Sequence, residues 1–171
     1  IRVAYFPDSF HGVNGVAHTS RQFVDFARRR NLPFLCVRAG NRPNAVENED
    51  ALTTLELPRG LLSIPLDQDL KLDPAWVRHI PAVARAVGGF RPDIIHITGP
   101  SEVGIVGAML AGWLRVPLAA SWHTNLHEYA ATRSHWLLEH LPGRQAALGA
   151  GCIQRAALTL ATVLYKRAQV L

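Results

Sequence analysis

The sequence lacks several features that would assign it to a class of protein at once. No uncharged apolar stretch approaches the roughly 18 residues needed to cross a bilayer, and the N-terminus has no basic region followed by an apolar signal segment. We therefore expect a soluble, cytoplasmic protein. Its two cysteines, Cys36 and Cys152, lie far apart among 171 residues, which favours two buried thiols in a reducing compartment over a disulfide.

The dinucleotide-binding fingerprint G-x-G-x-x-G is also missing. Gly12 and Gly15 follow the first apolar segment, but no third glycine completes the motif. After the second apolar segment, Arg38-Ala39-Gly40 stands where an acidic residue would bind a ribose. Both observations disfavour an NAD or flavin oxidoreductase.

Motifs typical of metal sites are weak or absent. His123 and His127 are spaced four residues apart, but the H-E-x-x-H pattern and a cysteine pair are missing, so zinc is disfavoured. Asp67-Gln68-Asp69 has the spacing of an Asp-x-Asp triplet but lies in an irregular, proline-rich region without strand context. We predict that the protein uses no metal ion.

The net charge of +5 is spread unevenly. Residues 47–73 form an acidic island between two basic regions, and the bases are dispersed without interleaved aromatic residues. This pattern does not favour nucleic acid, whereas a phosphate-bearing ligand or an anionic lipid surface fits it. The run Arg28-Arg29-Arg30 falls where a helix is expected to end, so we interpret it as complementing the helix dipole, with an acidic membrane surface as the alternative.

Apolar periodicity predicts alternating strands and helices. This order indicates an α/β fold, namely a Rossmann-like, doubly wound, mainly parallel sheet with helices on both faces. We expect the segment 58–74 to be mostly loop with at most one short strand, Gly88-Gly89 to end the second helix, and Ser101 to cap the third. The expected strands are 3–6, 34–37, 52–57, 94–97, 118–122 and the start of one at 168–171, and the expected helices are 16–30, 74–87, 102–114 and 145–167.

Ligands of doubly wound sheets bind outside the carboxyl ends of the strands. Three polar or glycine-containing loops fall at that edge, at 7–15, 98–102 and 123–129. The first loop leads into a helix whose first amides have no intrahelical partner, which indicates a site for an anion or a sugar phosphate. We interpret His96, inside an apolar strand, as a structural rather than a catalytic histidine.

Four motifs occur in the order and spacing of a known family. They are Asp8-Ser9-Phe10, Val13-Asn14-Gly15-Val16, Pro92-Asp93-Ile94-Ile95-His96 and Ser121-Trp122-His123-Thr124. With these motifs the chain resembles the N-terminal domain of retaining glycosyltransferases of family GT4, which have the GT-B fold. Within that family it looks similar to the bacterial and plant branch that glycosylates lipids.

The resemblance implies roles for particular residues. Asn14, Gly15 and Val16 would lie under the diphosphate of a UDP- or GDP-sugar donor, and His123 would act as the catalytic residue beside the reacting sugar. The sugar would be transferred with retention, and no cofactor beyond the nucleotide sugar is implied. Further residues that could line the site or bind the acceptor are Asp8, Ser9, Thr98, Gly99, Thr124, Glu128 and Tyr129.

The resemblance also implies that residues 1–171 form one Rossmann-like, acceptor-side domain. A complete enzyme of this type has a second Rossmann-like domain with a Glu-x7-Glu element that holds the nucleotide, and this chain does not contain it. We therefore expect the isolated domain to be inactive. The acceptor could be a lipid or another glycan precursor, and the protein could bind peripherally to the inner face of an anionic membrane. A non-catalytic binding or interaction module with the same fold is the alternative.

Overall fold

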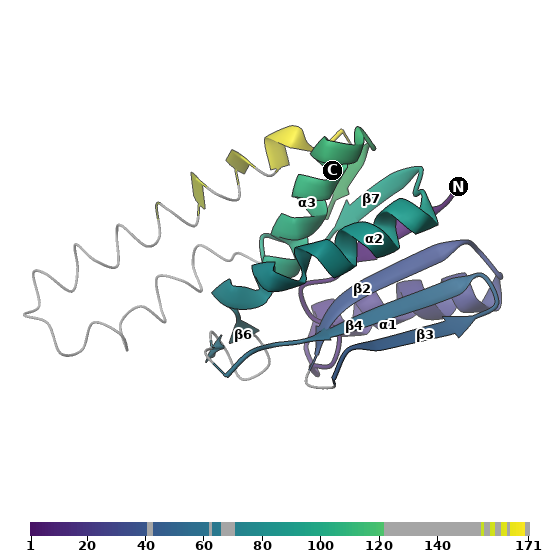
Figure 1. Ribbon diagram of the computed structural model, residues 1–171, viewed down its shortest axis with the longest axis horizontal. Coiled ribbons are helices and arrows are strands. Elements are labelled where there is room, and N and C mark those ends of the chain that lie inside the picture. Colours follow the sequence, from purple (N-terminus) through teal and green to yellow (C-terminus); the bar gives the residue numbers. More distant parts are fainter. Residues whose placement is uncertain are drawn as a thin grey trace, which may run out of the picture.

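The computed structural model describes residues 1–40, 43–61, 63–65 and 71–121, and the shorter pieces 155, 158–159, 162–163 and 165–169. Within these residues the chain forms a six-stranded sheet with helices packed on both faces (Figure 1). The predicted α/β, Rossmann-like, mainly parallel fold is confirmed. No described helix is both long and apolar enough to cross a membrane.

Five strands of the sheet run parallel and one edge strand is antiparallel. The strand order β3-β4-β2-β1-β7-β8 places β1 at the centre, between β2 and β7. The bounds are β1 Val3–Phe6, β2 Phe34–Gly40, β3 Ala45–Glu49, β4 Leu52–Pro58, β7 Ile94–Ile97 and β8 Leu118–Ala120. Because consecutive strands lie on both sides of β1, the chain order reverses there, and this is the point at which such sheets bind ligands.

The helices begin at side-chain caps. Asn14 accepts a hydrogen bond from the Ala17 N–H at 2.8 Å, and Ser101 accepts one from the Gly104 N–H at 3.3 Å. The second helical segment starts as a 3₁₀ helix, capped by Asp73, and continues as an α-helix. The bounds are α1 Gly15–Arg29, η1 Pro74–His79, α2 Ile80–Phe90 and α3 Glu102–Leu114.

Two apolar cores hold these layers together. On one face the larger core joins the sheet to η1, α2 and α3, and it encloses Phe6, Val37 and Trp76. On the opposite face a smaller core joins α1 to Tyr5 and Cys36. Side chains alternate between the faces along each strand, so consecutive residues of β1 supply both cores. Figure 1 shows α2 and α3 in front of the sheet and α1 behind it.

Several elements and boundaries differ from the sequence-based expectations. Residues 74–79 form a 3₁₀ rather than an α-helix, and Gly88-Gly89 do not end α2, which continues to Phe90 and stops where Arg91 adopts φ 51°. Strand β3 was not predicted, and the segment 58–74, where at most one short strand was expected, contains a small hairpin of two strands, β5 (Ile64–Pro65) and β6 (Lys71–Leu72). Strand β8 ends at Ala120, and the expected strand at 168–171 does not include Ala168 or Gln169.

Candidate functional site

Two of the three loops expected at the carboxyl edge of the sheet are described, and they contact each other. The loop after β1 spans 7–14, and the loop after β7 spans 98–101. The backbone N–H of Asp8 donates to Oγ1 of Thr98 at 2.8 Å, and Oγ of Ser101 donates to Oδ1 of Asp8 at 2.5 Å. Asp8 therefore joins the first loop to the start of α3. The third loop, with His123, Thr124, Glu128 and Tyr129, lies outside the described residues.

Two glycines make room for the Asp8 carboxylate. A Cβ on Gly99 would collide with the carboxylate, and a Cβ on Gly104 would collide with the carbonyl of Gly99. Thr98 and Gly99 are both buried, so they lie beneath the loop and support it. The structure thus gives Asp8, Thr98 and Gly99 contacts that hold the loop in place.

The Asp8 carboxyl is also electrostatically unusual. Its pKa is raised to about 7: burial is the largest cause and the nearby Glu102 carboxylate adds to the rise, whereas hydrogen bonds from Ser101 oppose it. Glu102 is itself 5% exposed and receives a 2.8 Å hydrogen bond from Nε of Arg59. Its second oxygen, Oε2, is buried and has no hydrogen-bond partner in the described structure. Burial likewise raises the Glu102 pKa, although Arg59 opposes the shift.

The N-terminus of α1 follows the same loop. Asn14 caps the helix and also donates from Nδ2 to Oγ of Ser9 at 3.2 Å, so Ser9, which is 8% exposed, fixes the cap rather than facing solvent. Within the described residues, the N–H groups of Gly15 and Val16 have no acceptor, as expected for the first positions of a helix.

The space next to Gly15 is open. The residue is exposed, and a Cβ built on it would meet no atom of the described structure within 4 Å. The first turn of α1 contains no acidic residue, in contrast to α3, which begins with Glu102. The positive end of the α1 dipole and two backbone donors are therefore accessible to an anion.

Three buried acidic residues pair with arginines near this edge, and sequence reasoning did not identify these pairs. Oε2 of Glu56 receives a 2.8 Å hydrogen bond from Nε of Arg38 and lies 3.1 Å from Nε2 of His11. The other two pairs are Glu102 with Arg59 and Asp73 with Arg78, the latter joined at 2.9 Å. In all three pairs the acid is almost fully buried and the arginine is more exposed. Part of the acidic island in the sequence therefore lies inside the protein.

The remaining candidates have structural contacts or lie outside the described residues. Nε2 of His96 is 2.6 Å from Oγ of Ser121, and the His96 ring packs against Tyr5 and Phe23, which supports the structural interpretation of this histidine. Among the described residues, no group of three or more His, Cys, Asp or Glu side chains could hold a metal ion. Asp67-Gln68-Asp69 is not described, so the absence of a metal stays a prediction.

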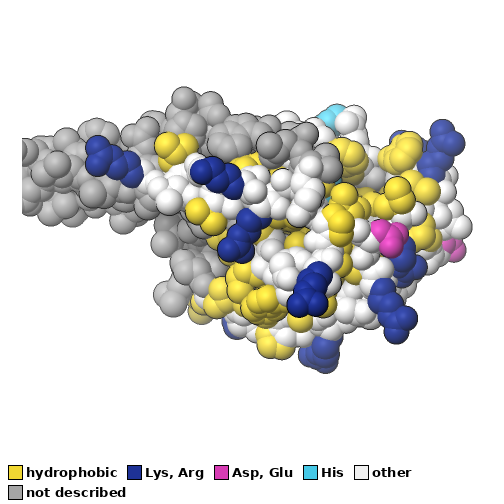
Figure 2. Space-filling view, turned by 90° about the horizontal axis from the view of Figure 1, so that it is seen from above, with side chains coloured by type: hydrophobic (Ala, Val, Ile, Leu, Met, Phe, Trp, Pro, Cys, Tyr) yellow, Lys and Arg dark blue, Asp and Glu magenta, His cyan; other side chains and the backbone are white. Residues whose placement is uncertain are grey.

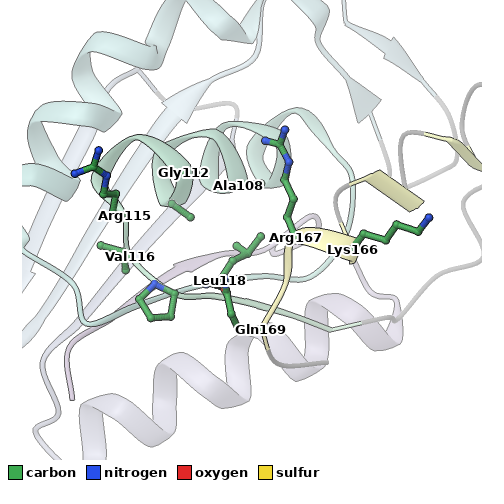
Figure 3. Close-up of a pocket in the computed structure, with 10 residues that line it drawn as sticks. Ala108, Gly112, Arg115, Val116, Leu118, Lys166, Arg167 and Gln169 are labelled. Carbon is green, nitrogen blue, oxygen red and sulfur yellow. Dashed lines mark hydrogen bonds between the residues drawn. The ribbon is translucent and has the colours of Figure 1, made fainter.

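A cavity of about 690 Å³ lies at the opposite edge of the sheet (Figure 3). It is bounded by the C-terminal half of α3, by the turn that leads into β8 and by described residues near the C-terminus. Because β8 begins at Leu118, this cavity is at the amino end of the strand. It is therefore separate from the loops that follow β1 and β7.

Together, the parallel sheet, its reversal at β1 and the open helix N-terminus define a Rossmann-like α/β domain whose α1 N-terminus is open at the carboxyl edge of the sheet. The family model described as "Glycosyl transferase 4-like domain" matches residues 14–171, which include Asn14, Gly15 and Val16. The chain belongs to this family of glycosyltransferases.

Two curated relatives give the comparison more detail. One, from Mycobacterium tuberculosis (strain CDC 1551 / Oshkosh), is 27% identical over 136 residues, which are 77% of this chain and 34% of the relative. The other, from Mycolicibacterium smegmatis (strain ATCC 700084 / mc(2)155), is 26% identical over 160 residues, which are 84% of this chain and 40% of the relative. Both relatives are named GDP-mannose-dependent alpha-mannosyltransferase. The chain thus spans well under half of the length of each.

Proposed function

We propose that this chain is the acceptor-side part of a glycosyltransferase that moves a hexose from a nucleotide sugar to an acceptor with retention of configuration. The observation that carries the proposal is the open N-terminus of α1, where the Gly15 and Val16 N–H groups have no acceptor among the described residues and a Cβ on Gly15 would meet no described atom within 4 Å. GDP-mannose is the first donor to test, because both curated relatives are named for their dependence on it. A UDP-sugar is the second.

In this proposal the amides of α1 stabilise the departing diphosphate. Negative charge develops on the diphosphate as the glycosidic bond breaks, and fixed backbone donors with a helix dipole stabilise such charge without having to reorganise. The first turn of α1 carries no acid that would oppose this effect. These groups supply the stabilisation without a metal ion. His123, which the family resemblance assigns to the reacting sugar, is proposed to contact its hydroxyl groups.

The remainder of the donor site is proposed to lie outside residues 1–171. The chain covers 34% and 40% of its two curated relatives, so most of each relative has no counterpart in it. We propose that a second Rossmann-like domain holds the nucleotide and that the isolated chain is inactive because it lacks that wall of the site. Micromolar binding of GDP-mannose or a UDP-sugar by the isolated chain would contradict this part of the proposal.

For the acceptor we propose a lipid or a lipid-linked glycan at the cytoplasmic face of a membrane. The net charge of +5 favours an anionic surface, and on the face seen in Figure 2 Lys and Arg side chains are more frequent than Asp and Glu. Sedimentation of the full-length protein with vesicles of phosphatidylglycerol and phosphatidylcholine tests this proposal. Binding at low salt that weakens at high salt supports it, and no binding at low salt contradicts it.

The transferase proposal is tested with full-length protein and a donor panel of GDP-mannose, GDP-glucose and UDP-glucose. Formation of the glycosylated product is followed by mass spectrometry, and the anomeric configuration of the product is determined by NMR. We expect transfer with retention, and loss of transfer in the His123→Ala variant with an unchanged circular dichroism spectrum. Absence of transfer from every donor would favour the alternative of a non-catalytic module.

A further inference from the structure

Arg21 lies in α1, and its guanidinium group reaches back to the loop that precedes the helix. Nη1 donates to the carbonyl oxygen of Phe10 at 2.6 Å and to that of Gly12 at 2.8 Å. From Asp8 to Gly12 the backbone makes no hydrogen bond to the backbone of another described residue. One side chain therefore supplies the contacts that regular secondary structure would otherwise provide in the middle of this loop.

The opposite side of the loop is held by strands β2 and β4. The guanidinium carbon of Arg38 lies 4.3 Å from the centre of the Phe10 ring, and Glu56 contacts both Arg38 and His11. Residues 10–12 thus lie between Arg21 on α1 and the Arg38–Glu56 pair on the sheet. With Asp8 fixed to Thr98, the loop is held along most of its length.

The two Arg21 hydrogen bonds also set the direction of the peptide dipoles. In a trans peptide the carbonyl of one residue and the N–H of the next point in opposite directions. The carbonyls of Phe10 and Gly12 point toward Arg21, so the N–H groups of His11 and Val13 point away from it. Two partially negative oxygens are thereby turned toward a cation, next to a helix N-terminus that has no acid in its first turn.

We infer that Arg21 is a positioning residue for the donor site: it fixes the loop that leads to Gly15 and Val16 and keeps the Phe10 and Gly12 carbonyls from facing a bound diphosphate. This inference rests on the proposed function. Arg21 acts through the loop and is not assigned a contact with the substrate. Neither the resemblance nor the candidate site derived from the sequence included this residue.

Three variants of the full-length protein test the inference. Arg21→Met removes the charge and both hydrogen bonds, whereas Arg21→Lys keeps a cation that can donate from one nitrogen. Arg91→Met is the charge-matched control, because Arg91 is exposed at the end of α2 and its side chain makes no hydrogen bond or ion pair in the described structure. The readouts are KM and kcat with GDP-mannose and the rate at which chymotrypsin cleaves the native protein after Phe10.

We expect Arg21→Met to lower kcat/KM for the donor about tenfold or more, to leave KM for the acceptor unchanged, and to speed chymotrypsin cleavage after Phe10. Arg21→Lys should reverse part of both effects, and Arg91→Met should match the wild type. The inference is wrong if Arg21→Met is cleaved after Phe10 as slowly as the wild type, or if its kcat/KM falls no further than that of Arg91→Met. If the wild type transfers no sugar, the proposed function fails, and the cleavage comparison still tests the role of Arg21 in the loop.

Discussion

Replacing Gly15 by alanine should separate ligand binding from folding. Gly15 is the first residue of α1, and no glycine of the described chain has a positive φ. A Cβ at this position would meet no atom within 4 Å. Alanine therefore fits the backbone without strain, and it restricts the unfolded chain more than glycine does. We expect Gly15→Ala to raise the free energy of unfolding by about 0.4–1 kcal/mol.

The same methyl group would occupy the space that the proposed function assigns to the donor diphosphate. It would hold the phosphate oxygens away from the Gly15 and Val16 amides, and such charge-assisted hydrogen bonds weaken steeply with distance. We expect kcat/KM for the nucleotide sugar to fall by about tenfold to a hundredfold, equivalent to about 1.4–2.8 kcal/mol. Steady-state kinetics of the full-length protein and denaturant unfolding measure the two effects on the same preparation.

Gly88→Ala provides the matched control. Gly88 lies in α2, and a Cβ on it would also meet no atom of the described structure within 4 Å. It should stabilise the protein by roughly the cost of a helical glycine, about 1 kcal/mol, with no change in kcat/KM. If Gly15→Ala binds and transfers the donor as well as Gly88→Ala does, the diphosphate does not lie against the N-terminus of α1, and the site proposed here is wrong.

Three further outcomes follow from the described contacts. The pKa of Asp8 is about 7 in the folded protein and 3.8 in an unfolded chain, so its contribution to stability is full at low pH and is lost as pH rises from about 4 to about 7. The difference in unfolding free energy between the wild type and Asp8→Asn should therefore fall over that range. A difference that does not change with pH would contradict this pKa. Gly104→Ala should lower the unfolding free energy measured by urea titration by about 1–3 kcal/mol, because the new Cβ would collide with the Gly99 carbonyl. Gly112→Ala on the same helix should not lower it, because a Cβ there would meet no atom within 4 Å. Equal stabilities of the two variants would show that the loop adjusts to the Gly104 substitution at no cost. Burial raises the pKa of Cys36 to about 12. In a Cys152→Ser variant, the Cys36 thiol should therefore react with a disulfide reagent only after the protein unfolds. Rapid labelling of the native protein would show that the smaller core opens.

The sequence was sufficient where a local signal determined the structure. The continuous apolar run Ile94–Ile97 became β7 with the expected bounds, and Ser101 caps a helix at the expected place. Val3–Phe6 likewise forms the central strand. In these cases a buried strand or a helix cap needs particular residue types, so composition alone indicates the element.

The sequence was insufficient where pairing decided the structure. Ala45–Glu49 is mostly polar and exposed, and it becomes β3 because it pairs with β4 rather than because it is apolar. Helix α2 continues through Gly88-Gly89 because Val83 and Val87 anchor it in the larger core. Tertiary packing therefore overrides the weak helix propensity of glycine at these positions.

The candidate site was predictable in part for the same reason. The loop positions of Asp8 and Gly15 follow from the order of strands and helices. The partners of the buried acids do not, because Arg59 and Glu102 are 43 residues apart in the sequence and meet only in the folded chain. Arg21 was missed because its contacts are with backbone carbonyls, which no residue pattern reveals.

Strand β3 has a consequence for how this protein associates with others. It forms one edge of the sheet, and four of its five residues are exposed, including Glu47 and Glu49. Charged side chains on an outer strand disfavour pairing with a strand of a second molecule, because pairing would move them out of water; Glu49 is held there in a 2.6 Å ion pair with Arg28. A strand that completes no core and binds no proposed ligand can thus serve the protein by limiting edge-to-edge aggregation.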